Sequence, residues 1–190
     1  MNLSETEVIL SEEVKRKLAL PFVKMSMGAG LHTMKPLDEW INQDGCANPE
    51  NDLVCTWDDI PLPDKCIDHM EMGDIIEHLV MWNRDRILKN WFRLIKIGGT
   101  IRISTPNLHR TMVDYANGKI TLELAIQNIY AWMSTPYEQH YYTYTVETLT
   151  KVLQDYGFDK IDFSESPAGT PTDKSMSWWL VCSAVKVKDV

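Results

Sequence analysis

The sequence contains few cysteines, and their spacing excludes the usual structural uses of this residue. The four are Cys46, Cys55, Cys66 and Cys182. They include no CxxC pair and no zinc-type spacing with histidine. We therefore expect free thiols in a reducing compartment, and we predict no metal site.

Long apolar runs are also absent. No stretch approaches the ~18 uninterrupted apolar residues of a membrane-spanning helix. The N-terminal residues, MNLSETEVILSEEVKRKLAL, mix acidic side chains into the apolar ones, which is unlike the apolar region of a signal peptide. These absences favour a cytoplasmic protein with no membrane partner.

Clustered positive charge is absent as well. The formal net charge is −8, and the lysines and arginines are spread thinly along the chain. A surface that follows a phosphate backbone needs grouped basic residues, so we expect no nucleic-acid partner. An acidic protein suits a cationic or neutral small molecule better. The composition leaves the oligomeric state open.

What is present is an ordinary globular composition. The 190 residues are 44% hydrophobic and 24% charged, which suits one domain with a sizeable core and argues against disorder. We find no internal repeat and no linker. The sequence therefore predicts a single domain over residues 1–190, with a helical segment in residues 1–20.

Strand-like and helix-like segments alternate along the chain. Short apolar segments predict seven strands, at residues 23–27, 40–43, 53–55, 67–72, 100–104, 160–164 and 178–187. Amphipathic periodicity predicts four helices, over residues 5–18, over 85–96 ending at Gly98-Gly99, from about 121, and from 146 to about 156. The third helix is expected to bury Leu122, Ile126, Ile129 and Met133, and the fourth Val146, Leu149, Val152 and Leu153. This alternation indicates an α/β protein with a mostly parallel sheet, and the closely spaced final strands suggest an antiparallel edge.

Candidate binding residues directly follow the predicted strands, because ligands of open parallel sheets bind beyond the carboxyl ends of the strands. In strand order they are Gly28 and Gly30; Asp44; Trp57, Asp58 and Asp59; Met72, Gly73 and Asp74; and His109. The glycine turn alone also fits a tight connection with no ligand. We interpret His78 as a packed residue in the middle of a helix that begins near Ile75, and Glu77 as a structural residue.

Several segments together carry a family pattern. The chain reads VKMSMGAG, then WINQD, then DDIPLPDKCIDHMEMGDIIEHL, then ILKNWFRLIKIGGTIRISTPNL, and finally HYYTYTVETLTKVLQDYGF. In this order and spacing they resemble the class I S-adenosylmethionine-dependent methyltransferases, in a branch that acts on small molecules. The resemblance covers roughly residues 22–163. It implies a Rossmann-like fold whose mostly parallel seven-stranded sheet has an antiparallel C-terminal strand and helices on both faces.

The resemblance also implies a cofactor and a role for each candidate. S-adenosylmethionine would lie against the turn formed by Met27, Gly28, Ala29 and Gly30. The ribose hydroxyls would meet Asp44, next to Gly45. The adenine would lie near Trp57, Asp58 and Asp59, and the methionine end near Met72 and Gly73. Residues 108–145 would form a helix and loop insertion on the substrate side.

Three interpretations of function remain. The first is an active enzyme that methylates oxygen or nitrogen of a small acceptor such as a sugar or metabolite, with Asp74, His109 or His140 as the base. Each of these also has a simpler explanation: Asp74 as a helix cap, His109 as a solvated loop residue and His140 as part of a tyrosine-rich loop. The second is a cofactor-binding or structural protein that has lost catalysis. The third is a nicotinamide-dependent oxidoreductase, which is disfavoured because Thr33 stands where a third glycine is needed.

Overall fold

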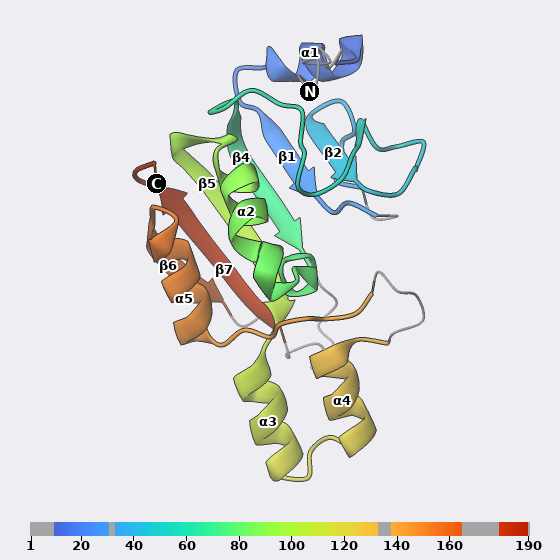
Figure 1. The fold of residues 1–190 in the computed structure, drawn as a ribbon, viewed down its shortest axis with the longest axis vertical. Coiled ribbons are helices and arrows are strands. Elements are labelled where there is room, and N and C mark those ends of the chain that lie inside the picture. The colour runs from blue at the N-terminus through green and yellow to red at the C-terminus, as the bar shows by residue number, and fades with distance from the viewer. Residues whose placement is uncertain (1–9, 31–32, 133–137, 165–178, 190) are drawn as a thin grey trace, which may run out of the picture.

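The computed structural model describes residues 10–30, 33–132, 138–164 and 179–189, and its centre is one seven-stranded sheet (Figure 1). The strands are β1 (Lys24–Met27), β2 (Trp40–Asp44), β3 (Leu53–Val54), β4 (Ile67–Gly73), β5 (Ile95–Pro106), β6 (Phe158–Ser164) and β7 (Trp179–Lys186). The helices are α1 (Glu12–Leu18), the short 3-10 helix η1 (Ile76–His78), α2 (Met81–Phe92), α3 (Leu108–Ala116), α4 (Leu122–Tyr130) and α5 (Val146–Asp155).

The strand order confirms the predicted fold class. The strands run β3-β2-β1-β4-β5-β7-β6 across the sheet. The pairs among β1 to β5 are parallel, whereas β7 is antiparallel to both β5 and β6. Helices lie around this sheet (Figure 1). The carboxyl ends of β1, β2, β4 and β5 therefore meet at one edge, where ligands of such sheets bind.

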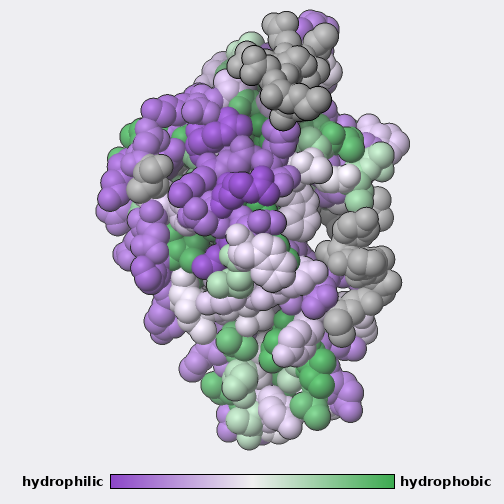
Figure 2. Space-filling view, viewed as in Figure 1, coloured by the Kyte–Doolittle hydropathy of each residue, from purple (hydrophilic) through white to green (hydrophobic). Residues whose placement is uncertain are grey.

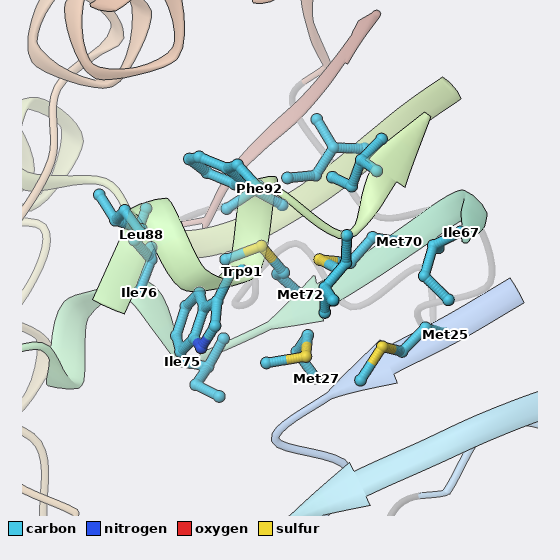
Figure 3. Packing of buried hydrophobic residues seen from close by; sticks show 14 of the residues in the cluster. Met25, Met27, Ile67, Met70, Met72, Ile75, Ile76, Leu88, Trp91 and Phe92 are labelled. Atoms are coloured by element: carbon cyan, nitrogen blue, oxygen red, sulfur yellow. The ribbon is translucent and has the colours of Figure 1, made fainter. Parts of the chain in front are cut away.

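The core lies between the central strands and α2. In β1 and β4, Met25 pairs with Met70 and Met27 with Met72, and all four side chains are buried. They pack beneath α2, whose Trp91 is fully buried (Figure 3). Each such side chain stabilises the fold by roughly 1.5–3 kcal/mol relative to exposure. The strand methionines are thus core residues.

The predicted boundaries of the α2 helix were wrong. It begins at Met81 and ends at Phe92, and the apolar residues Leu94 and Ile95 lead into β5 instead. Gly98-Gly99 lies inside β5 and does not end a helix. Gly98 has a φ of +84°, and the β4–β5 register shifts between Ile67 and His69. The glycine pair therefore accommodates an irregularity in the strand.

Helices α3 and α4 form a hairpin that projects beyond the end of the sheet (Figure 1). The sequence patterns did not single out α3, whose first turn is capped by the Asn107 side chain. In α4 only Ala125 is buried, and the expected burial of Leu122 and Ile126 was wrong because their exposed fractions are 51% and 42%. Apolar surface gathers over this hairpin (Figure 2). Met133 lies outside the described residues.

The two remaining helices follow their predictions in part. Helix α1 starts at Glu12, with Ser11 as its N-cap, whereas the expected start near residue 5 lies outside the described residues. Helix α5 buries Leu149, Val152 and Leu153 as predicted, but Val146 is exposed in its first turn. In the parts of the chain that the structure describes, no helix has the length and apolarity needed to cross a membrane.

Candidate active site at the carboxyl ends of the strands

The turn after β1 is built on two glycines in the left-handed region. Gly28 has a φ of +64°, and a Cβ placed there would lie 2.3 Å from Cδ1 of Ile75. Gly30 has a φ of +54°, but among the described residues its Cβ would meet only the Gly28 carbonyl oxygen, at 4.0 Å. Gly28 is therefore needed for packing against the segment after β4. Gly30 instead leaves open space beside the turn.

Hydrogen bonds from β2 hold this turn in place. The Ala29 amide donates to the Gln43 carbonyl at 2.9 Å, and the Gly30 amide donates to Asp44 Oδ2 at 2.9 Å. Asn48 Nδ2 donates to the Gly30 carbonyl at 2.8 Å. The buried Gln43 side chain connects the turn to the residue after β3: its Oε1 accepts from the Gly28 amide at 3.5 Å, and its Nε2 donates to the Cys55 carbonyl at 2.9 Å. Sequence reasoning missed Gln43, whose position within β2 gave no signal.

The carboxylate of Asp44 is fixed at the end of β2. Its Oδ2 accepts from the Gly30 amide, and its Oδ1 accepts from the Cys46 amide at 2.7 Å. Each carboxylate oxygen keeps a second lone pair, so Asp44 can also accept two hydroxyl groups without leaving this position. A Cβ at the adjacent Gly45 would lie 3.6 Å from Trp57 Nε1. The indole of Trp57 therefore lies next to the Asp44 corner of the site.

The residues after β3 have different environments. Trp57 is half-buried against the core, and its carbonyl accepts from Trp91 Nε1 at 2.7 Å. Asp58 forms an ion pair with Arg86 of α2 at 2.6 Å, and this hydrogen bond lowers the pKa of the Asp58 carboxyl. Asp59 is exposed. The structure thus brings Trp57 to the candidate site while the Asp58 carboxylate is held by α2.

Met27 and Met72 contribute to the site only through their backbones. Both side chains lie in the core beneath α2 (Figure 3). The neighbouring Gly73 is exposed, and a Cβ on it would lie 3.7 Å from Ser104 Oγ. At the carboxyl end of β4, the exposed surface next to the glycine turn is therefore formed mostly by backbone atoms.

Polar side chains collect just beyond β4. Asp74 adopts a φ of +51°, and Ser104 Oγ donates to its Oδ1 at 3.4 Å. Protein surrounding this carboxyl raises its pKa to about 7, although water that still reaches the exposed side chain moderates the effect. Glu77 is fully buried and accepts from Thr105 Oγ1 at 3.0 Å through Oε2. Burial, with a smaller contribution from the charge of Asp74, raises the pKa of Glu77 to about 8.

Two histidines complete this group. His78 Nδ1 lies 3.1 Å from the Gln139 carbonyl oxygen, and its ring meets that of His140 edge-on with centroids 4.9 Å apart. His140 Nε2 lies 4.0 Å from Glu77 Oε1. Burial lowers the pKa of His140 to about 4, so its ring is neutral at physiological pH.

His140 reaches Glu77 because the segment between α4 and α5, here called the crossing segment, returns across the end of β4. The Tyr141 and Tyr142 amides donate to the Glu77 carbonyl at 2.9 and 3.2 Å. Asp74 and His140, predicted separately, are thus brought to one region, and Glu77 and His78 join them. The sequence analysis assigned Glu77 and His78 structural roles. The one signal that could have identified them as site residues is their position directly after the fourth strand.

His109 occupies a different position. It lies exposed in the first turn of α3. Across residues 10–30, 33–132, 138–164 and 179–189, no hydrogen bond or ion pair joins it to Asp74, Glu77 or His140. Among the described residues, His109 is therefore not bonded to the polar group beyond β4.

Comparison with known proteins identifies the fold. No protein-family profile and no curated protein matches the sequence. Among solved structures, the chain is similar to 1,6-didemethyltoxoflavin-N1-methyltransferase of Burkholderia thailandensis, with a TM-score of 0.59 and 15% identity over 93% of this chain and 76% of that one. An S-adenosylmethionine-dependent methyltransferase of Archaeoglobus fulgidus matches with a TM-score of 0.60 and 16% identity, over 91% of this chain and 89% of that one. A further S-adenosylmethionine-dependent methyltransferase, from Thermotoga maritima, matches with a TM-score of 0.57 and 17% identity, over 92% of this chain and 87% of that one.

These likenesses and the strand order agree. The chain has the Rossmann-like fold of the class I S-adenosylmethionine-dependent methyltransferases. Because the identities are low, the comparison defines the fold, and the chemistry has to be argued from the site itself.

Proposed function

We propose that this protein is an S-adenosylmethionine-dependent methyltransferase that acts on a small-molecule acceptor. The observation that carries the proposal is the Asp44 carboxylate, which the Gly30 and Cys46 amides hold beside a glycine turn at the end of β2. The similar Burkholderia structure contains bound S-adenosylhomocysteine, the product form of this cofactor.

The residues present fit the cofactor. The free lone pairs of Asp44 suit the two ribose hydroxyls, and the open space beside Gly30 lets a ligand approach the backbone. Trp57, next to Gly45, offers an aromatic face for the adenine ring. Ala29, Asp58, Asp59 and the backbones of Met27, Met72 and Gly73 complete the proposed contact region. The described part of the connection between Gly30 and β2, residues 33–39, contains no helix, which suits a cofactor with no pyrophosphate.

Asp74 and His140 are the proposed proton acceptors. The bound cofactor would supply an activated methyl group, and the protein would position the acceptor and remove its proton. A pKa near 7 suits Asp74 for that role at neutral pH, and His140 is present as the neutral ring. The separate location of His109 makes it the weaker candidate.

Residues 108–145 are proposed to form the acceptor side of the site. The His140 amide donates to the Tyr130 carbonyl at 3.4 Å, which connects the end of α4 to the segment that carries His140. Exposed apolar side chains on α3 and α4 provide contact area for an organic acceptor. The net charge of −8 and the four free cysteines support a non-nucleic-acid substrate and a cytoplasmic location.

Calorimetry of cofactor binding tests the proposal. We expect the wild-type protein to bind S-adenosylhomocysteine, and Asp44→Ala to weaken binding about 10–100-fold, because charge-assisted hydrogen bonds to the ribose are lost. Asp38→Ala removes the same charge from an exposed loop and should bind like wild type. Absence of binding to the folded wild-type protein would overturn the proposal.

A second measurement separates an enzyme from an inactive binding protein. The protein is incubated with cell extract and S-adenosylmethionine carrying a labelled methyl group. Label recovered in a small molecule supports the proposed reaction and identifies the acceptor. Tight cofactor binding with no transfer to any extract component would instead favour the catalytically inactive alternative.

A further inference from the structure

Three potential metal ligands meet beyond the end of β4. Glu77, His78 and His140 each place one ligand atom within 4.8 Å of the others. Glu77 is fully buried, and the His140 side chain is only 9% exposed. These residues come from η1 and from the crossing segment after α4, so the fold brings them together over a long sequence separation.

The polar atoms of this cluster are incompletely satisfied by the protein. Thr105 donates to Glu77 Oε2, but no atom in the described part of the chain hydrogen-bonds to Glu77 Oε1 or His140 Nδ1. The 4.0 Å between His140 Nε2 and Glu77 Oε1 is too long for a hydrogen bond. Buried polar atoms in native proteins are nearly always paired, so the unpartnered Oε1 of the fully buried Glu77 points to a bound group.

The orientation of His78 suits coordination. A carbonyl oxygen can only accept a hydrogen bond, so the contact with Gln139 places the proton of the neutral ring on Nδ1. The lone pair is then on Nε2. Metal-binding histidines are commonly held in this way, by a backbone carbonyl on the other ring nitrogen.

We propose that Glu77, His78 and His140 bind one divalent transition-metal cation of the zinc class. Two imidazoles and one carboxylate form a recognised zinc donor set that leaves a coordination position open. Ligand atoms around tetrahedral zinc lie about 3.4 Å apart at bond lengths near 2.1 Å. The observed separations therefore need only a small closure. Coordination uses the lone pair of His140, so with a metal bound Asp74 is the proton acceptor that remains beside the site.

Zinc binding by the full-length chain tests this site directly. The protein is freed of metal with a chelator, the chelator is removed, and zinc is added in equilibrium dialysis with no cofactor present. We expect one zinc ion per chain. His78→Ala and His140→Ala should weaken binding by more than 100-fold, because loss of an outer-shell partner alone costs about 10–100-fold. His69→Ala is the matched control, since this half-buried histidine bonds Thr100 outside the cluster.

A second variant and a spectrum make the result decisive. Glu77→Gln keeps an acceptor for Thr105 but removes the anionic ligand, and circular dichroism verifies that each variant is folded. Cobalt in place of zinc should give visible bands of a nitrogen and oxygen site. Strong near-ultraviolet absorption from thiolate ligands would instead assign the metal to cysteines and overturn the proposal, as would unchanged zinc affinity in both histidine variants. Because the cofactor is absent, these outcomes are independent of the proposed methyl transfer.

Discussion

The glycine turn after β1 lies against the segment after β4 through Gly28 and Ile75. The carboxylates on its two sides, Asp44 at the end of β2 and Glu77 beyond β4, are held in opposite ways. At the end of β2, both oxygens of Asp44 accept from backbone amides that lie within fourteen positions of it in the chain. Beyond β4, Glu77 keeps one buried oxygen with no partner among the described residues. The Asp44 corner, at the end of β2, has its hydrogen bonds complete without a ligand. The Glu77 corner, beyond β4, depends on the distant segment that carries His140 and on the proposed metal ion.

The largest expected effect distinguishes the two glycines of the turn. Gly28→Ala should lower the free energy of unfolding by about 2–4 kcal/mol, because left-handed strain adds to overlap with buried Ile75. Gly30→Ala has the same kind of strain but open space, and should cost about 1 kcal/mol. Urea unfolding measures both. Equal losses would show that the contact between the two segments does not constrain the turn.

The next prediction concerns the two carboxylates. Asp44→Asn should cost about 1–3 kcal/mol, because an amide nitrogen would face the Gly30 or Cys46 amide. Glu77→Gln, in metal-free protein, should stay within about 1 kcal/mol of wild type or be more stable, since it removes a poorly paired buried acid. Denaturant unfolding in the presence of chelator gives both values. The same sign and size for the two changes would contradict the contrast drawn between the corners.

Thiol reactivity provides a smaller, local measurement. Cys46 is exposed, and its amide bonds Asp44. Burial raises the pKa of Cys66 to about 11 and of Cys182 to about 12, so these thiols should react slowly at about pH 8. Saturating S-adenosylhomocysteine should slow modification of Cys46 about tenfold, which corresponds to ~1.4 kcal/mol. Mass spectrometry of each modified peptide provides the rates, and an unchanged rate at Cys46 would place the cofactor elsewhere.

The smallest effect concerns Asp58. Its ion pair with Arg86 is well exposed, so Arg86→Ala should change stability by less than about 1 kcal/mol. The variant also frees the Asp58 carboxylate. If Asp58 contacts the adenine, cofactor affinity measured by calorimetry should stay equal or rise in Arg86→Ala. A clear loss of affinity would show that Arg86 itself supports the binding region.

Local signals in the sequence were sufficient to mark the glycine turn and Asp44, which the structure brings together, but not the cluster beyond β4. The glycines and Asp44 directly follow apolar strands, and the turn is built from neighbouring positions, so position alone marked them. Glu77 and His140 meet only because the chain crosses back after α4. A pattern within a short window contains no information about that crossing.

The same reasoning explains the errors in the fold. The strands that form the core were placed within a few residues, because apolar segments and turn-forming residues define them. Leu94 and Ile95 continue the helical spacing of α2, although tertiary pairing assigns Ile95 to β5. In α4 the periodicity predicted a helix, but periodicity cannot show whether another element packs against its apolar residues. Leu122 and Ile126 of that helix are exposed to solvent.

The hairpin leaves and rejoins the sheet at neighbouring points. Asn107 pairs with Tyr144 in a parallel bridge, and the Leu108 amide donates to the Tyr144 carbonyl at 3.0 Å. A segment whose ends are adjacent behaves as a replaceable module, since exchanging it leaves the strand register unchanged. Asp44, Glu77 and His78 would then stay with the scaffold during evolution, whereas His140 would be inherited with the module.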